Sequence, residues 1–120
     1  MNLLAKILTL FIAIFHVGIL VLEMFYWDTP FGHRAFDMTP EAAASSVILA
    51  MNQGLYNGFL AAGLFWGVIS SRVDIKTFFL CCVVIAGIFG GITAKPSIIV
   101  VQALPALIAL ILTHLSSRNR

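Results

Sequence analysis

Four long apolar segments dominate this chain of 120 residues. A helix needs about 20 predominantly apolar residues to cross the hydrocarbon core of a bilayer, and segments of this length fall at about 3–27, 40–70, 75–94 and 97–115. Hydrophobic residues make up 61% of the chain and charged residues 10%, whereas a soluble domain carries about 25% charged residues. The sequence therefore predicts an all-α fold, a four-transmembrane-helix bundle that forms a single integral membrane domain over residues 1–120.

The ends of the first two segments carry recognisable signals. The first apolar run ends in the aromatic residues Phe25, Tyr26 and Trp27 and is longer than the apolar region of about 7–15 residues in a signal peptide, so we interpret it as a retained transmembrane helix. Thr39 is a candidate N-cap of the second helix, because Pro40 follows it at the first helical position.

Lysine and arginine distinguish the two sides of the predicted bundle. Cytoplasmic flanks of membrane helices carry an excess of these residues. Five of them flank the side that holds both termini, and two lie on the other side: Lys6, Arg72, Lys76, Arg118 and Arg120, against Arg34 and Lys95. We therefore expect a multi-pass protein of the cell membrane with both termini in the cytoplasm. The net charge of +2 is too small to favour nucleic acid as a partner.

Glu23 lies inside the first apolar segment, and a carboxylate there costs roughly 3 kcal/mol on insertion scales. Counted from the outer ends of the helices, Glu23 lies roughly 6 Å deep, Gln102 roughly 9 Å and Asn52 and Gln53 roughly 10 Å. His16 and Asn57 lie roughly 16 Å deep, with Tyr56 just above. These counts predict a shared polar column, which makes the following residues candidates for binding a ligand or proton: Glu23, His16, Asn52, Gln53, Tyr56, Asn57 and Gln102.

Two interpretations of these polar residues remain open. Burial disfavours the charged form of a carboxylic acid, so a hydrogen-bonded Glu23 that is neutral at pH 7 could exchange its proton for a cation or act as a general acid or base. Buried amides also join membrane helices without further function, at about 0.6 kcal/mol each. In that case Glu23 would bond His16 or Asn52 as part of the packing.

The sequence predicts no metal site and no cofactor. Zinc needs three or four ligands of the His, Cys or carboxylate type, and His16 and Glu23 supply two. A haem between two histidines would need both at one depth, but His114 lies near the cytoplasmic end. Cys81 and Cys82 are adjacent on one helix, point about 100° apart, and are expected to be small apolar residues.

Small residues recur at the spacing that lets membrane helices approach closely. Glycines lie four residues apart at Gly54 and Gly58, at Gly63 and Gly67, and at Gly87 and Gly91. The spacing is typical of a tight bundle and of a homodimer. Pro105 lies within the fourth segment and leaves the carbonyl of Val101 without its helical partner, so we expect a kinked, polar spot near Gln102.

Three stretches of sequence carry a resemblance that extends over nearly the whole chain. They are the run 52–64, which opens Asn-Gln-Gly-Leu-Tyr-Asn-Gly, the run 22–27 followed by Thr29, Pro30 and Phe36, and the run 102–106. With these motifs the chain resembles an uncharacterised family of small bacterial four-helix membrane proteins, domain of unknown function 1304, whose members are sometimes labelled epimerase. The resemblance implies the fold and a location in the bacterial inner membrane.

Three functions fit these observations. One is a small transporter or binding protein for an apolar or cationic molecule, with Glu23 as the coupling carboxylate. Another is a membrane enzyme that acts on a lipid-like substrate, with Glu23 and His16 as acid and base and Tyr56 polarising an oxygen. The third is an accessory or structural subunit without a substrate. The expected partners are the lipid bilayer, a small apolar or cationic ligand, and a second copy of the chain.

Overall fold

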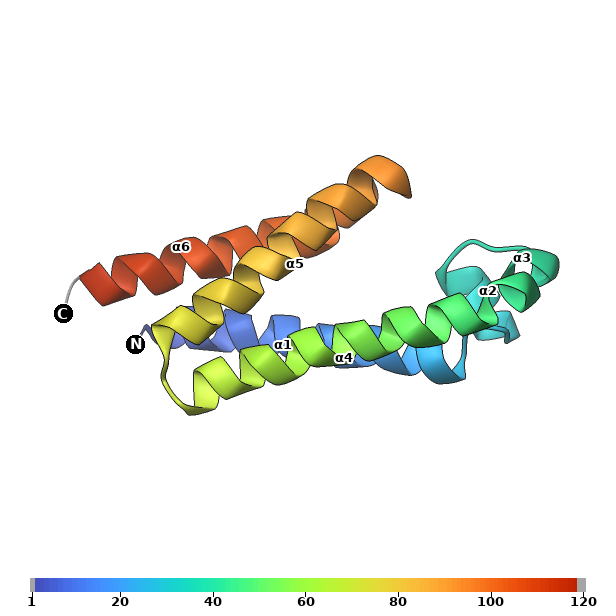
Figure 1. Cartoon of the computed structure of the whole chain (residues 1–120). Coiled ribbons are helices and arrows are strands. Elements are labelled where there is room, and N and C mark those ends of the chain that lie inside the picture. Colours follow the sequence, from blue (N-terminus) through green and yellow to red (C-terminus); the bar gives the residue numbers. More distant parts are fainter. Residues whose placement is uncertain (1, 119–120) are drawn as a thin grey trace. The chain divides into compact units, whose positions relative to one another are not determined.

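A computed structural model describes residues 2–118, and for 116–118 it describes the backbone alone. The elements in chain order are the helices α1 (Leu3–Phe25), α2 (Pro30–Ala35), α3 (Pro40–Ser45), α4 (Val47–Ile69) and α5 (Val73–Thr93), a π-helix η1 (Ile99–Ala103) and α6 (Leu104–Arg118) (Figure 1). The described residues form no strand, which confirms the predicted all-α class. Arg120, which entered the charge count above, lies outside the described residues.

The chain divides into two compact units. One contains the residues up to Ile14 together with those from Leu60 onward, and the other contains Phe15–Phe59. The first unit has an apolar core in which residues of α1, α4, α5 and α6 pack together: Ile12, Ala13, Leu64, Leu80, Val83, Ala106 and Ala109.

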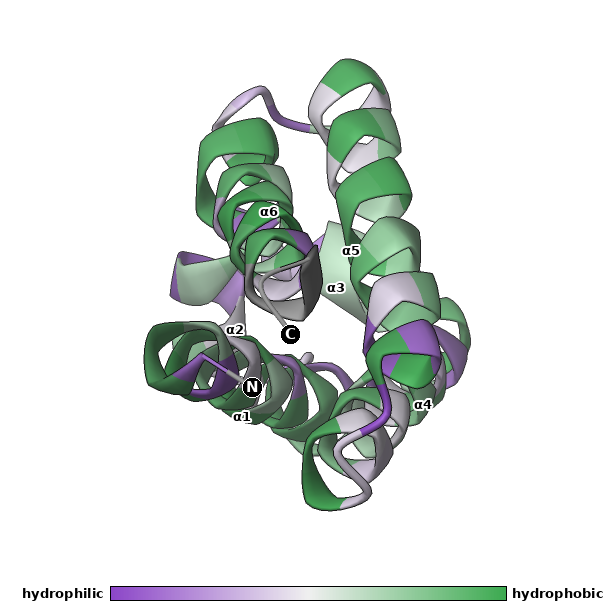
Figure 2. Ribbon diagram, turned by 90° about the vertical axis from the view of Figure 1, so that its left-hand side faces the viewer, coloured by the Kyte–Doolittle hydropathy of each residue, from purple (hydrophilic) through white to green (hydrophobic). Residues whose placement is uncertain are grey.

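Within the first unit, small residues let α5 approach α6 and η1, and Figure 2 shows α5 and α6 side by side. A Cβ at Gly87 would lie 2.8 Å from the backbone nitrogen of Ala103. That is closer than side-chain atoms tolerate, so this approach of backbone to backbone requires glycine. The spacing of Gly87 and Gly91 thus serves packing inside this unit.

A π-helix occupies the place where the sequence predicts a kinked, polar spot. The backbone N–H of Leu104 donates to the carbonyl of Ile99, five residues back, at the end of η1. Pro105 has no N–H to donate, so the regular α-helical pattern cannot run through this turn. The side-chain amide of Gln102 donates to the carbonyl of Val83 on α5, 3.2 Å away, and so joins the irregular turn to its neighbour.

In the second unit, the connection expected between the first two long helices contains the short helix α2. Thr29 caps it, because its Oγ1 accepts from the backbone N–H of Gly32 at 3.1 Å. Thr39 caps α3 in the same way, through Ala42 at 3.1 Å. Figure 1 shows α2 and α3 between the end of α1 and the start of α4.

The helix expected over 40–70 is divided at Ser46 into α3 and α4. The hydroxyl of Ser46 donates to the carbonyl of Ala42 at 2.7 Å, and the hydroxyl of Ser45 donates to the same carbonyl at 3.0 Å. Serine side chains compete in this way with backbone hydrogen bonds. The apolar pattern continues across Ser46, so it does not indicate the break.

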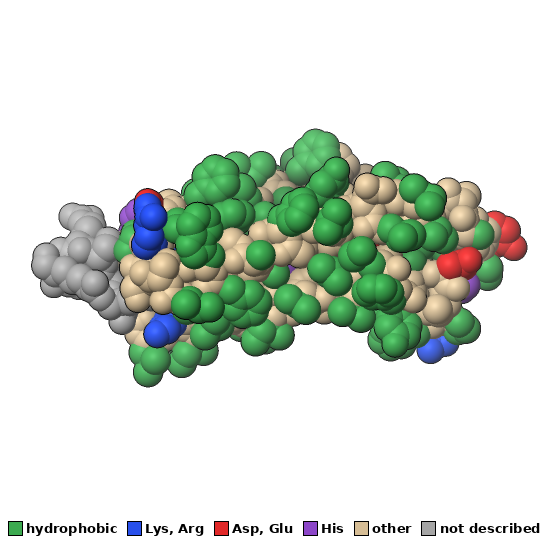
Figure 3. All heavy atoms as spheres, turned by 60° about the horizontal axis from the view of Figure 1, so that its bottom comes forward, with side chains coloured by type: hydrophobic (Ala, Val, Ile, Leu, Met, Phe, Trp, Pro, Cys, Tyr) green, Lys and Arg blue, Asp and Glu red, His purple; other side chains and the backbone are tan. Residues whose placement is uncertain are grey.

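Two of the described helices, α1 and α5, are long and apolar enough to cross a membrane by length and composition. The apolar stretch Ile99–Leu115 is shorter. α4 has the length of a span, but a group of polar residues in its first half lowers its hydropathy: Asn52, Gln53, Tyr56 and Asn57. Hydrophobic side chains nevertheless cover much of the face drawn in Figure 3.

Candidate functional site

Glu23 forms the centre of a polar site in the second unit, between α1 and α4. Its Oε1 accepts a hydrogen bond of 2.6 Å from Nδ2 of Asn57, and the residue is 7% exposed. Gly54 allows this proximity, because a Cβ there would lie 3.1 Å from the Cβ of Glu23 and 3.2 Å from the carbonyl oxygen of Leu20. The backbone of α4 can therefore pass close to the acid.

A hollow of about 210 Å³ opens beside the acid. Two helices line it, together with one residue shortly after α1 and one directly after α3. The lining residues are Glu23, Trp27, Ser46, Leu49, Ala50 and Gln53. The indole N–H of Trp27 donates to Oγ of Ser46 at 3.0 Å, and its ring contacts Phe36, with 4.7 Å between centroids. These contacts hold the aromatic wall of the hollow in place.

The site holds a carboxyl group that forms no ion pair with any of the residues described by the structure. The ion pairs that the structure shows join His33 to Asp28 and Arg72 to Asp74, and Glu23 takes part in neither. Among the residues that line the hollow, Glu23 carries the titratable side chain. A buried carboxylate needs compensation for its charge, and a proton or a cation in the hollow would provide it.

The other predicted site residues in this unit differ in their surroundings. Gln53 lines the hollow, whereas Asn52 is exposed and its amide donates to the carbonyl of Ile48 in its own helix, at 2.9 Å. Tyr56 is 55% exposed and its ring lies against that of Phe59. Among the described residues, neither Asn52 nor Tyr56 forms a hydrogen bond with Glu23, which bonds Asn57 instead.

His16 and Gln102 have surroundings of their own. His16 is buried and makes an edge-on contact with the ring of Phe15. Seven residues separate it from Glu23 along α1, which corresponds to roughly 10 Å, so the two side chains do not share a direct hydrogen bond. Gln102 belongs to the first unit, where it bonds to Val83 as described above.

The depth count from the sequence placed Asn57 well below Glu23, but the two side chains meet. The Cα–Cβ bond of a helical residue tilts toward the start of its helix, and Figure 1 shows the second half of α1 antiparallel to the first half of α4. Glu23 and Asn57 therefore lean toward each other, while Asn52 leans away. A count of Cα positions omits this tilt, which is why it grouped Glu23 with Asn52.

Sequence reasoning did not include Trp27 and Ser46 among the site residues. The sequence places Trp27 among the aromatic residues that end the first apolar run, and Ser46 inside the helix expected over 40–70. The adjacent serines at 45 and 46 were the available signal, because serine favours helix ends and turns over helix interiors. Ser46, at the break after α3, accepts the hydrogen bond from the indole of Trp27.

Comparison with known proteins agrees with the resemblance seen in the sequence motifs. The model of the family described as "Protein of unknown function (DUF1304)" matches residues 10–114. The chain is 31% identical over 115 residues to "Uncharacterized protein YpaA" of Lactococcus lactis subsp. lactis (strain IL1403), a match that covers 92% of this chain and 97% of that protein. No solved structure gives a significant match. With a family model matched over most of its length, the chain belongs to the DUF1304 family.

Proposed function

We propose that the chain is a four-span protein of the cell membrane with both termini in the cytoplasm. The apolar helices α1 and α5 would supply two spans, and α4 and the stretch formed by η1 and α6 would supply the others. Two of the polar residues of α4 fit this assignment, because Asn57 bonds Glu23 and Gln53 lines the hollow inside the second unit. Polar side chains inside membranes ordinarily face protein or a cavity in this way.

The function that this site supports best is the binding of a small organic cation with apolar groups, as in a small transporter or binding protein. The observation that carries the proposal is that Glu23 is buried, forms no ion pair with a described residue, and lines a hollow. Trp27 presents an aromatic ring to the same hollow, and aromatic faces attract organic cations. Leu49 and Ala50 add apolar surface, so charge and shape both favour an organic ammonium ion.

The proposed chemistry is an exchange of one positive charge for another. In the empty site a proton neutralises Glu23, and when the cation enters, the carboxyl group releases that proton to solvent and becomes the counter-ion. One proton leaves for each cation bound, so the charge of the site is conserved. Coupling of this kind would let a proton gradient drive transport of the cation.

The two alternative functions have less support. A purely structural hydrogen bond would not require the hollow beside Glu23. An enzyme that uses His16 with Glu23 would need both at one substrate, but their positions on α1 differ by roughly 10 Å. The hollow of about 210 Å³ is also smaller than the roughly 300–1,000 Å³ of pockets for drug-sized ligands, so a small organic cation suits it better than a lipid-like substrate.

Fluorescence of Trp27 provides the test, with phenyltrimethylammonium as the probe. The full chain carrying Trp66→Phe, which leaves Trp27 as the single tryptophan, is purified in detergent and titrated with the probe. We expect saturable quenching that is at least about tenfold weaker in Glu23→Gln, because the amide cannot balance the positive charge. Glu41→Gln is the matched control, since Glu41 is an exposed carboxylate of α3.

The neutral isostere tert-butylbenzene separates charge from shape. The wild-type site should prefer the cation to the isostere, and Glu23→Gln should remove that preference. Equal quenching by the cation in wild type and Glu23→Gln, or an equal loss in Glu41→Gln, would contradict the proposal. Size-exclusion profiles of the variants establish that each remains folded.

A further inference from the structure

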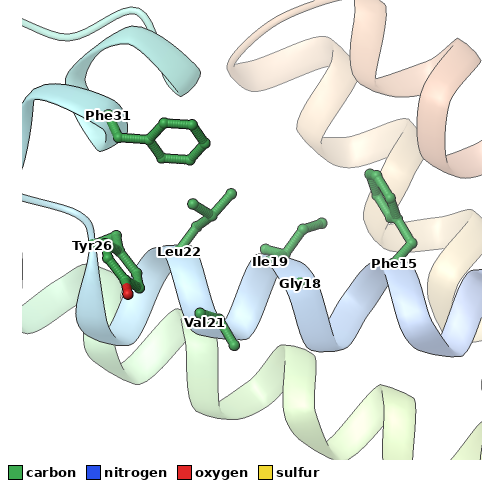
Figure 4. Close-up of a pocket in the computed structure, with 7 residues that line it drawn as sticks. All are labelled: Phe15, Gly18, Ile19, Val21, Leu22, Tyr26 and Phe31. Carbon is green, nitrogen blue, oxygen red and sulfur yellow. The ribbon is translucent and has the colours of Figure 1, made fainter.

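A second hollow lies on the second unit, and its lining is apolar. Its volume is about 600 Å³, and it lies along α1 with Phe31 of α2 above it, as Figure 4 shows. Phe15, Gly18, Ile19, Leu22 and Tyr26 are among its lining residues. We call this feature the α1 groove. A Cβ built on Gly18 would meet no atom within 4 Å, so the floor of the groove is open.

The length of the α1 groove matches one leaflet of a bilayer. Eleven residues separate Phe15 from Tyr26, which is roughly 16 Å of helix, and half of the hydrocarbon core is about 15 Å thick. Tyr26 and the adjacent Trp27 lie at one end, and tyrosine and tryptophan favour the boundary between hydrocarbon and headgroups. The groove therefore runs from the headgroup level to about the middle of the membrane.

The helix α2, which contributes Phe31 to the groove, also carries a basic side chain. Arg34 is three residues after Phe31 on α2, a spacing that places two residues on the same face of a helix. Arg34 is exposed, whereas its neighbour His33 is held by Asp28 at 2.9 Å. A guanidinium group binds phosphate through two parallel hydrogen bonds, so Arg34 complements the phosphate of a lipid.

We propose that the α1 groove binds a glycerophospholipid of the outer leaflet, with one acyl chain in the groove and the phosphate at Arg34. This inference rests on the membrane placement proposed above but not on ligand binding at Glu23. A flexible acyl chain fits a groove whose walls are large, irregular side chains such as Phe15, Leu22 and Phe31. A helix from a second copy would pack better on a line of small residues, and here Gly18 is the small one among the lining residues.

Filling the groove tests the proposal. Gly18→Leu places an apolar side chain where the structure has open space, so we expect the variant to fold. The full chain is purified in detergent, supplied with phosphatidylglycerol, and examined by native mass spectrometry. We expect Gly18→Leu to bind the lipid about tenfold more weakly than wild type, comparable with the loss of two buried methylene groups. Ala86→Leu, at an exposed small residue of α5, is the matched control and should bind as wild type does.

A second pair of variants tests the phosphate contact. Arg34→Gln should weaken the binding of phosphatidylglycerol. It should leave the binding of diacylglycerol unchanged, because diacylglycerol has the same chains and no phosphate. Lys95→Gln, at another exposed basic residue, should change the binding of neither lipid.

Three results would overturn the proposal. One is equal lipid binding in wild type and Gly18→Leu, and another is equal binding of phosphatidylglycerol in wild type and Arg34→Gln. The third is a wild-type dimer that Gly18→Leu converts to monomer without loss of lipid, which would make the α1 groove an interface between copies. Trp27 fluorescence on the same samples reports cation binding separately, so failure at the lipid site and failure at Glu23 are distinguishable.

Discussion

At the scale of single residues, the hydrogen bond between Glu23 and Asn57 is the feature on which the proposed site depends. The sequence indicates both residues, because polar side chains are rare within apolar segments. It does not indicate that they are partners, since this depends on the tilt of each side chain along two antiparallel helices. The same tilt leaves Asn52, at similar depth to Glu23 by count, bonded to its own helix.

Replacing each of these asparagines by alanine should therefore have different effects. Asn57→Ala removes the amide that donates to Glu23, and we expect a loss in the free energy of unfolding of about 0.6–1.7 kcal/mol, the range for such bonds between membrane helices. Asn52→Ala should lower the free energy of unfolding by less, because the exposed amide of Asn52 donates only to the carbonyl of Ile48 in its own helix. Unfolding in mixed micelles measures both. A greater loss for Asn52→Ala would contradict the assignment of the partner.

At the scale of elements, glycine determines how closely helices approach in each unit. In the second unit Gly54 brings α4 to α1, and in the first Gly87 brings α5 to the end of η1. The sequence predicts that such close contacts exist, from the spacing of the glycines. It cannot say which neighbour each glycine meets, because several apolar helices present similar small residues at the same spacing.

Alanine at Gly87 should destabilise the protein, although alanine favours helix over glycine by about 1 kcal/mol. Its Cβ would lie 2.8 Å from the backbone nitrogen of Ala103, and overpacking of this kind costs about 1–3 kcal/mol. Gly18→Ala is the control, because its Cβ meets open space and only the gain in helix propensity remains. Thermal unfolding in detergent should show a lower Tm for Gly87→Ala than for the wild type. The Tm of Gly18→Ala should equal or exceed that of the wild type. The opposite order would contradict this packing.

The boundaries of elements show what a hydropathy pattern can and cannot predict. The all-α class follows from long apolar segments separated by polar residues. The break at Ser46 and the π-helix η1 depend on side-chain hydrogen bonds and a missing N–H, and they leave the apolar pattern unchanged. The break matters for the proposed site because Ser46, the residue at the break, bonds Trp27.

At the scale of the whole molecule, the proposed topology follows from the distribution of lysine and arginine. One of the counted residues, Lys76, is buried in the first unit beside Gly67. Its position therefore reflects packing as well as the side of the membrane. The remaining basic residues on that side still outnumber Arg34 and Lys95. The proposed orientation therefore does not depend on Lys76.

Reporter fusions measure this topology directly. Green fluorescent protein should fluoresce when fused to either terminus, because it folds in the cytoplasm. Alkaline phosphatase inserted after Asp37 or after Lys95 should be active, since it folds outside the cytoplasm. Active phosphatase at either terminus would mean that the number of spans or the orientation is different.

In the proposed site a cation and a proton compete for Glu23, and proton release measures this competition most directly. Phenyltrimethylammonium is added to the purified chain in weakly buffered detergent solution at a pH where Glu23 is protonated, and the change in pH is recorded. We predict release of up to about one proton per cation bound, with affinity rising up to about tenfold per pH unit, and neither effect in Glu23→Gln. Cation binding by the wild type without proton release at any pH, or the same release from Glu23→Gln, would contradict the account.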